Sequence, residues 1–370
     1  MTLEQIELRR ISLPLVRPFR TSFGIQTERD VLLIRATVDG VDGWGECVAG
    51  AVPDYSSEFT AGAQLVIEQF LAPRLLAADH VTAATVSSTL GGIDGHRMAK
   101  GALELAVLDA ELRAAGLSLS DHLGGVRRTV EVGVSIGITD TIDELVTVVR
   151  THVEEGYARV KLKIEPGFDA EPVARIRREF GDDLAIQVDA NTAYTLDDVG
   201  VFETLDASAL LLIEQPFAED DLLDHAELAR RINTPVCLDE GITTRLVARQ
   251  AVELGACSIV NIKAGRVGGH LAGRDIHDDC LTAGVRVWCG GMLETGIGRA
   301  ANLALASLRG FTLPGDISAT DRYWQRDVCD PFVLGPDSSI DVPKGPGLGI
   351  DVDEEFVDAI TTEVRTISTD

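Results

Sequence analysis

Hydrophobic and polar positions divide the chain into two parts with different periodicities. In residues 1–125, strand-like stretches at 5–15 and 31–38 come before helical patterns at 57–77 and 99–115. This order predicts a small α+β domain. Proline, glycine and polar residues predict loops at two further places, residues 17–24 and 50–57.

Beyond Val130, short β-branched runs alternate with amphipathic helical stretches, which is typical of βαβ units and a parallel sheet. A closed barrel over residues 126–325 and an open doubly wound sheet both fit this alternation. The proline-rich stretch at 326–370 predicts a tail of loops and short strands that returns to the first domain. The eight predicted strands lie at residues 130–136, 159–164, 185–188, 209–213, 235–238, 258–262, 285–289 and 312–316.

Five of these strands end in an ionisable residue, at intervals of 24 to 26 residues. A strand, a helix and their loops occupy about this length, so the five residues take equivalent places at the carboxyl ends of successive strands. In a barrel, those ends meet at the mouth that holds the active site. The five residues are Lys163, Asp189, Glu214, Asp239 and Lys263.

The three acids of this series predict a metal site. Asp189, Glu214 and Asp239 supply hard oxygen donors, which favour Mg²⁺ or Mn²⁺ over Zn²⁺. The alternative is that the acids pair with lysines and cap neighbouring helices. An isolated buried charge costs several kcal/mol, so one shared cation is the simpler explanation for three buried carboxylates.

The lysines predict acid/base chemistry. Lys161 and Lys163 share a strand face, so the charge of Lys161 is expected to lower the pKa of Lys163 from about 10.4 toward neutrality, where an amine acts as a base. Lys263 would face Lys163 across the mouth. A proton beside a carboxylate can be removed only if nearby cations stabilise the charge that develops. The alternative is that the lysines only balance the acids.

Composition excludes several classes of partner. The net charge of -26 and the pI of about 4.6 exclude nucleic acid, whose phosphates require clustered Lys and Arg. No apolar run reaches the roughly 18 residues of a membrane span, which predicts a cytoplasmic protein without a membrane partner. The six cysteines are scattered through apolar runs, so free core thiols are expected rather than disulfides or a zinc site.

The strand-end lysines and acids resemble those of the enolase superfamily, in its muconate-lactonizing subgroup. The resemblance covers nearly the whole chain and implies an α/β fold: a (β/α)₈ TIM-type barrel at 126–325, with an N-terminal α+β capping domain at 1–125 completed by the tail at 326–370. Longer strings are similar to those of the o-succinylbenzoate synthase / N-succinylamino acid racemase branch: PFRTSFG at 18–24, GGMLETGIGR at 290–299, PGDI at 314–317 and DRYW at 321–324.

This resemblance implies an enzyme that uses Mg²⁺, or Mn²⁺ as a substitute, on a small carboxylate substrate with a succinyl group. The first activity is syn-dehydration of 2-succinyl-6-hydroxy-2,4-cyclohexadiene-1-carboxylate, a step toward menaquinone. There Lys163 takes the α-proton and returns it to the departing hydroxide on the same face, while Lys263 contributes charge. In the second activity, racemisation of N-succinylamino acids, the two lysines are opposed bases.

A non-catalytic metal-binding barrel kept for assembly is the third alternative, and a homo-oligomer is expected in each case. Composition does not separate dehydratase from racemase, because both need the same metal and lysines. Dipeptide epimerases of the subgroup are expected to carry Asp-x-Asp at the eighth strand. The single acid there, Asp316, argues against that activity.

The resemblance also implies substrate-binding residues, each with a structural alternative. Phe23 and Tyr55 either form a lid or only pack their loops on the barrel. Ser135 and Asn191 either contact the substrate and the metal site or cap a helix or loop.

Two residues of the seventh-strand loop, Gly291 and Met292, either line the pocket or form a turn beside a core methionine. Arg20 is expected to join Lys161, Lys163 and Lys263 in a positive mouth for a dianionic substrate. Arg266 either tunes the charge of Lys263 or is a surface residue of its loop.

Overall fold

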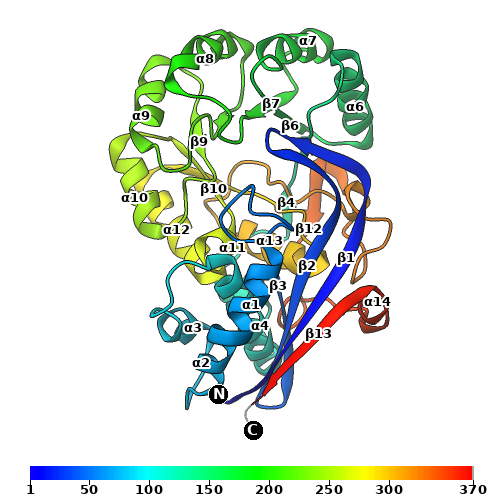
Figure 1. Cartoon of the computed structure of the whole chain (residues 1–370). Coiled ribbons are helices and arrows are strands. Elements are labelled where there is room, and N and C mark those ends of the chain that lie inside the picture. The colour runs from blue at the N-terminus through cyan, green and yellow to red at the C-terminus, as the bar shows by residue number, and fades with distance from the viewer. Residues whose placement is uncertain (369–370) are drawn as a thin grey trace.

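The computed structural model describes residues 1–368 and contains two main sheets. One is a four-stranded antiparallel sheet in the order β13-β1-β2-β3, and the other is a seven-stranded parallel sheet in the order β11-β10-β9-β8-β7-β6-β5. Figure 1 shows that the last strand (red) lies beside the first (blue), so the two ends of the chain share one sheet. The strands of the antiparallel sheet are β1 (Leu3–Thr21), β2 (Gly24–Val38), β3 (Val41–Cys47) and β13 (Thr361–Ser368).

The loop predicted at residues 17–24 is wrong, because β1 and β2 continue as a hairpin that turns at Ser22 and Phe23. Figure 1 shows this blue hairpin reaching across to β6 and β7. Pro18 is tolerated because the β1–β2 register is irregular between Pro14 and Phe19. The loop predicted at residues 50–57 is confirmed.

The first part of the chain also carries a group of helices. The helix predicted at 57–77 is divided by a π-helical turn before Pro73, which has no N–H to donate to the main-chain oxygen of Gln69. The long helix α4 packs tightly on β3, because a side chain at Gly45 would lie 2.1 Å from the oxygen of Ala102. The helices are α1 (Thr60–Val66), η1 (Ile67–Leu71), α2 (Ala72–Leu76), α3 (Ala83–Thr89), α4 (Arg97–Ala115) and α5 (Leu119–Leu123).

Seven of the eight predicted barrel strands form, with changes at two of them. The first divides into β4, which pairs with β12 (Ser339–Asp341), and β5, which pairs with β6. The fourth begins later than predicted, at Ile213, and Ala209 at the predicted start has a φ of 51°, outside the strand region. The strands are β4 (Thr129–Glu131), β5 (Val134–Ile136), β6 (Arg159–Lys163), β7 (Ala185–Asp189), β8 (Ile213–Glu214), β9 (Val236–Leu238), β10 (Ile259–Ile262) and β11 (Arg286–Cys289).

The eighth strand predicted at 312–316 does not form, since Pro314 has no N–H for a strand ladder. Single parallel bridges instead join Phe311 to Val287 and Gly315 to Val132. This segment therefore lies between the first and seventh strands and takes the closing position of the barrel.

Helices surround the parallel sheet and form the outer layer in Figure 1. Amphipathic sequences explain the placement of most of them, because a buried apolar stripe faces the strands, whereas Gly296–Ala306 is buried over its whole length. Short helical turns lie in several loops, and α14 precedes β13. The longer elements are α6 (Ile142–Glu155), α7 (Ala170–Phe180), α8 (Val199–Leu205), α9 (Leu222–Arg231), α10 (Arg245–Leu254), α11 (Ala264–Val267), α12 (His270–Ala283), α13 (Gly296–Ala306) and α14 (Glu354–Ile360).

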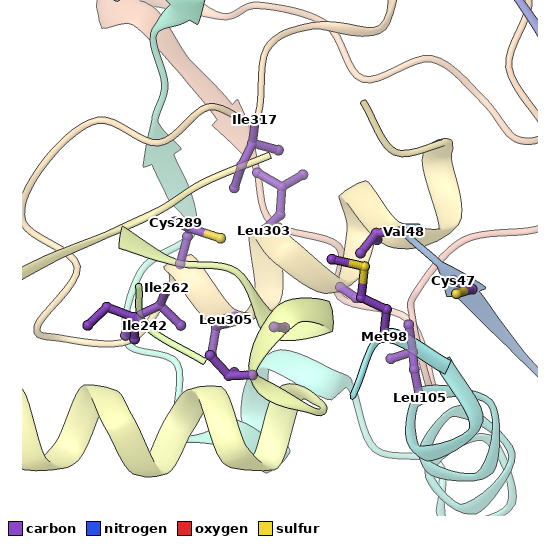
Figure 2. Packing of buried hydrophobic residues seen from close by; sticks show 14 of the residues in the cluster. Cys47, Val48, Met98, Leu105, Ile242, Ile262, Cys289, Leu303, Leu305 and Ile317 are labelled. Carbon is purple, nitrogen blue, oxygen red and sulfur yellow. The ribbon is translucent and has the colours of Figure 1, made fainter. Parts of the chain in front are cut away.

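One apolar cluster joins the antiparallel sheet, its helices and the barrel. Figure 2 shows Val48, Met98 and Leu105 from the first part of the chain near Leu303 and Leu305 of α13. All six cysteines are buried and unpaired, as predicted. In the part of the chain that the structure describes, no helix has the length and apolar character needed to cross a membrane.

A buried carboxylate lies where α4 meets the barrel. Glu104 is 3% exposed and accepts the main-chain N–H of Leu271, at the start of α12, at 3.1 Å. Burial raises the pKa of Glu104 from its usual 4.5 to about 7. The folded protein therefore binds this proton more tightly than the unfolded chain does.

We expect Glu104→Gln to remove a loss of stability that accompanies rising pH. Because the folded pKa is the higher one, the wild type loses stability as the pH rises from about 4.5 to about 7. The free energy of unfolding of the variant minus that of the wild type should therefore increase by up to about 3 kcal/mol between about pH 5 and about pH 8. Urea denaturation measures both, with exposed Glu154→Gln as the control. An equal difference at both pH values would contradict the prediction.

Candidate active site

The parallel sheet brings the predicted strand-end charges to one level. Lys163 pairs in register with Asp189, and Asp189 with Glu214. Asp239 and Lys263 follow the last residues of β9 and β10. All five side chains are buried, with exposed fractions of 8% or less.

Two lysines of β6 share one cluster of acids. The amine of Lys163 donates to Asp189 Oδ2 at 2.7 Å and to Asn191 Oδ1 at 2.6 Å. Lys161 lies deeper, with its amine 2.5 Å from Asp316 and 3.1 Å from both Asp189 and Glu214. The ring of Trp288 lies 5.0 Å from the Lys161 amine. Lys161 is therefore tied to three carboxylates, whereas Lys163 holds one carboxylate and an amide.

The opposite side of the site is built around Asp239. Lys263 donates to Asp239 Oδ2 at 2.8 Å and to the Tyr55 hydroxyl at 3.2 Å. Arg266, whose exposed fraction is 4%, donates to Asp239 and to the same hydroxyl. Of the two alternatives for Arg266, the surface position is wrong, because this arginine is buried as an ion-pair partner of Asp239.

The two facing lysines have opposite pKa shifts. Burial lowers the pKa of Lys163, and the charge of Lys161 adds to the shift. The predicted direction is confirmed, but desolvation is a larger cause than the neighbouring lysine. Burial also disfavours the charged form of Lys263, yet Tyr55, Glu240 and Glu214 together raise its pKa above the usual value. Lys163 is therefore the one of the pair that gives up its proton more readily.

The three acids fit a hard divalent cation by their chemistry. Asp189, Glu214 and Asp239 are oxygen donors from adjacent strands, and all are 1% exposed or less. Burial and the charge of Asp189 raise the pKa of Glu214, a repulsion that a shared cation would relieve. Their oxygens turn toward the lysines, and within residues 1–368 no group of three His, Cys, Asp or Glu side chains is close enough to hold an ion. The metal-ligand role of these acids stays a prediction.

A cavity lies above these charges. Lys163 and Lys263 both line it, and among its lining residues Asp54 is the single acid. Its walls come from the β1–β2 hairpin, the loop at residues 50–57 and the loop after β11. The lining residues are Phe19, Thr21, Phe23, Gly24, Gln26, Arg29, Gly50, Asp54, Tyr55, Lys163, Asn191, Lys263, Gly291, Met292 and Leu293.

Most of the predicted substrate-binding residues line this cavity. Phe23 and Tyr55 approach edge to face, with ring centroids 6.4 Å apart. Asn191, Gly291 and Met292 also belong to the cavity lining. These five placements agree with a role in binding.

Two predicted residues do not line the cavity. Arg20 points the other way, toward Glu165 at 3.0 Å and Asp140 at 3.5 Å. The reason is strand alternation: Phe19 faces the cavity, so its neighbour on the hairpin faces away. Ser135 is buried beside β6, and its hydroxyl has no hydrogen-bond partner in the described chain.

Comparisons with known proteins agree with this geometry. Residues 5–124 match the model of the mandelate racemase / muconate lactonizing enzyme N-terminal domain, and residues 144–356 match the enolase C-terminal domain-like model. The chain belongs to the enolase superfamily. The predicted family is therefore confirmed.

Relatives within the enolase superfamily carry both predicted activities in their names. An N-succinylamino acid racemase from Amycolatopsis sp is 58% identical over 98% of both chains. An o-succinylbenzoate synthase from Geobacillus kaustophilus is 45% identical over 98% of this chain and 96% of the relative. A solved enolase-superfamily structure from Listeria innocua has a TM-score of 0.95 at 37% identity, covering 100% of this chain and 99% of the other.

This enolase-superfamily site also contains polar residues that the sequence analysis gave no role. Asn261 donates to Glu214 Oε1 at 2.8 Å, and Glu240 accepts from Asn191 at 2.8 Å. Asp316 binds both Lys161 and Arg159. The available signal was strand alternation, because Asn261 and Arg159 lie two residues before a site lysine and so share its face.

Proposed function

We propose that this enolase-superfamily enzyme dehydrates 2-succinyl-6-hydroxy-2,4-cyclohexadiene-1-carboxylate to o-succinylbenzoate. The observation that carries the proposal is one cavity lined by two lysines from opposite sides of the barrel mouth, above three buried acids. Relatives named o-succinylbenzoate synthase, at 40% to 45% identity over nearly the whole chain, support this substrate.

Asp189, Glu214 and Asp239 would hold the metal ion, Mg²⁺ or Mn²⁺. When bound, the ion supplies positive charge to the substrate carboxylate while the adjacent carbon loses its proton. The pairs Lys163–Asp189 and Lys263–Asp239 place each lysine beside a ligand, so both amines lie near that carboxylate. Asn191 holds Lys163 from the other side.

In the dehydration, the amine of Lys163 removes the α-proton and then gives it to the departing hydroxide on the same face. Lys263 stays protonated and stabilises the negative charge from the opposite side. Tyr55 and Phe23 exclude water over the cavity. The ring becomes aromatic as the hydroxide leaves, which drives the reaction forward.

Racemisation of N-succinylamino acids is the second proposed activity. It is favoured by the same two lysines facing one cavity, since racemisation needs a base on one face and an acid on the other. The relative from Amycolatopsis sp has this activity in its name. Both reactions begin with the loss of a proton beside a carboxylate.

We also propose that different parts of the chain carry out catalysis and closure of the site. Residues 126–325 carry the catalytic groups, while residues 1–125 and the tail at 326–370 form the cap that closes over the substrate. A homo-oligomer in the cytoplasm is the proposed setting.

The test is ¹H NMR of the enzyme with Mg²⁺, given the cyclohexadiene substrate and N-succinylamino acids in parallel in D₂O. We expect aromatisation of the first and α-deuteration of the second, both abolished by a chelator and restored by Mg²⁺ or Mn²⁺. Deuteration without aromatisation would make the racemase the main activity. Absence of both reactions would contradict the proposed function, and full activity in chelator would contradict the metal site.

A further inference from the structure

A buried arginine in the cavity wall has no acidic partner. Arg29 lies on β2, is 2% exposed and lines the same cavity as Lys163 and Lys263. Its Nη2 donates to the main-chain oxygens of Val48 at 3.2 Å and Ala49 at 3.4 Å. Within residues 1–368, no carboxylate lies within ion-pair distance of it.

The carboxylates around Arg29 do not form ion pairs with it. Glu46 and Glu294 favour its charged form most strongly, but neither lies within ion-pair distance. Asp54 is the acid that lines the cavity, and its Oδ1 accepts the main-chain N–H of Tyr55 at 2.8 Å. Burial also disfavours the charged form of Arg29, lowering its pKa, although guanidinium keeps its charge at neutral pH. A buried cation of this kind is costly unless an anion joins it.

The guanidinium is held so that one edge remains available. The two carbonyls fix Nη2, whereas Nη1 has no hydrogen-bond partner in the described chain. A side-chain carbon added at Gly50 would lie 4.0 Å from Nη1, an ordinary contact distance, so this glycine lies beside the free nitrogen. This edge lies in the wall formed by the hairpin and the loop at residues 50–57.

We propose that Arg29 is the specificity-determining residue that binds the remote carboxylate of the succinyl tail. This inference rests on the proposed function, in which the substrate is a dicarboxylate whose first carboxylate lies at the lysines. Arg29 and those lysines line the same cavity, so a ligand bound in it can contact both. A carboxylate at Nη1 forms a charge-assisted hydrogen bond with a guanidinium that is already oriented. Arg29 thereby takes the role that the sequence assigned to Arg20.

The test compares two ligands that differ only at the tail: o-succinylbenzoate and the neutral amide made from its tail carboxylate. Calorimetry measures their affinities for the Mg²⁺-loaded wild type, Arg29→Met, Arg29→Lys and Arg35→Met. Arg35 is the matched control, because it lies on the same strand but pairs with Glu7 and Glu354, away from the cavity.

We expect the wild type and Arg35→Met to bind the dicarboxylate about a hundredfold more tightly than the amide. In Arg29→Met this ratio should fall to about one, and in Arg29→Lys to an intermediate value. Equal losses for both ligands would mean that Arg29 only orders the loop, and would overturn the inference. A wild type that does not discriminate between the ligands would overturn it even if Arg29→Met fails to fold. Tighter binding of the dicarboxylate than of the amide, without any turnover, would support the inference about Arg29 and contradict the proposed reaction.

Discussion

The kcat of Lys163→Ala is expected to be at least about a thousandfold lower than that of the wild type, for both dehydration and α-proton exchange. The amine of Lys163 lines the cavity and is held by Asp189 and Asn191, so alanine leaves no base on that face. Asp189 keeps Lys161 as an ion-pair partner at 3.1 Å, and the fold should therefore survive. ¹H NMR in D₂O with Mg²⁺ measures both reactions.

The matched control for this variant is Lys344→Ala, which removes an exposed lysine far along the tail. Its kcat should equal that of the wild type. Circular dichroism should show the same thermal midpoint, within a few degrees, for all three proteins. Activity within tenfold of the wild type in a folded Lys163→Ala would exclude Lys163 as the base.

The strand-end charges were the most predictable part of this molecule. Each ionisable residue follows a buried run of a strand, and parallel strands of a barrel present their carboxyl ends at one mouth. The structure places Lys163, Asp189 and Glu214 in register and buries all five charges. The sequence pattern contains this information because strand, helix and loop lengths repeat.

The partners of the charges could not be predicted, because they depend on contacts between distant segments. Arg29 lies between Glu28 and Asp30 and resembles an exposed strand residue. It contacts the carbonyls of Val48 and Ala49, which lie in the loop that follows β3. Arg266 is likewise buried through Asp239 and Tyr55, from two separate parts of the chain.

Errors in local structure had consequences for the site. Proline and glycine at residues 17–24 predicted a loop, in which Arg20 and Phe23 could both turn inward. The hairpin that forms instead fixes alternate side chains on opposite faces, so Phe19, Thr21 and Phe23 line the cavity and Arg20 does not. The secondary structure of this segment therefore determines that the Arg20 side chain faces away from the substrate cavity.

Lys263→Ala is expected to separate the two proposed reactions. Racemisation of N-succinylamino acids should fall at least about a thousandfold, because the second face loses its acid and base. The enantiomer whose α-proton faces Lys163 should still exchange that proton with D₂O, whereas the other enantiomer should not. Dehydration needs only the charge of Lys263 and should fall less, about a hundredfold.

The remaining site should tolerate this substitution, because Arg266 still pairs with Asp239 when Lys263 is absent. Chiral chromatography and ¹H NMR of each pure enantiomer in D₂O measure racemisation and exchange separately, and Lys344→Ala again provides the control. Exchange of both enantiomers at the wild-type rate would rule out Lys263 as the second base. If neither enantiomer exchanges in a folded variant, Lys163 requires the charge of Lys263 to act, and the two lysines form a single catalytic unit rather than two independent bases.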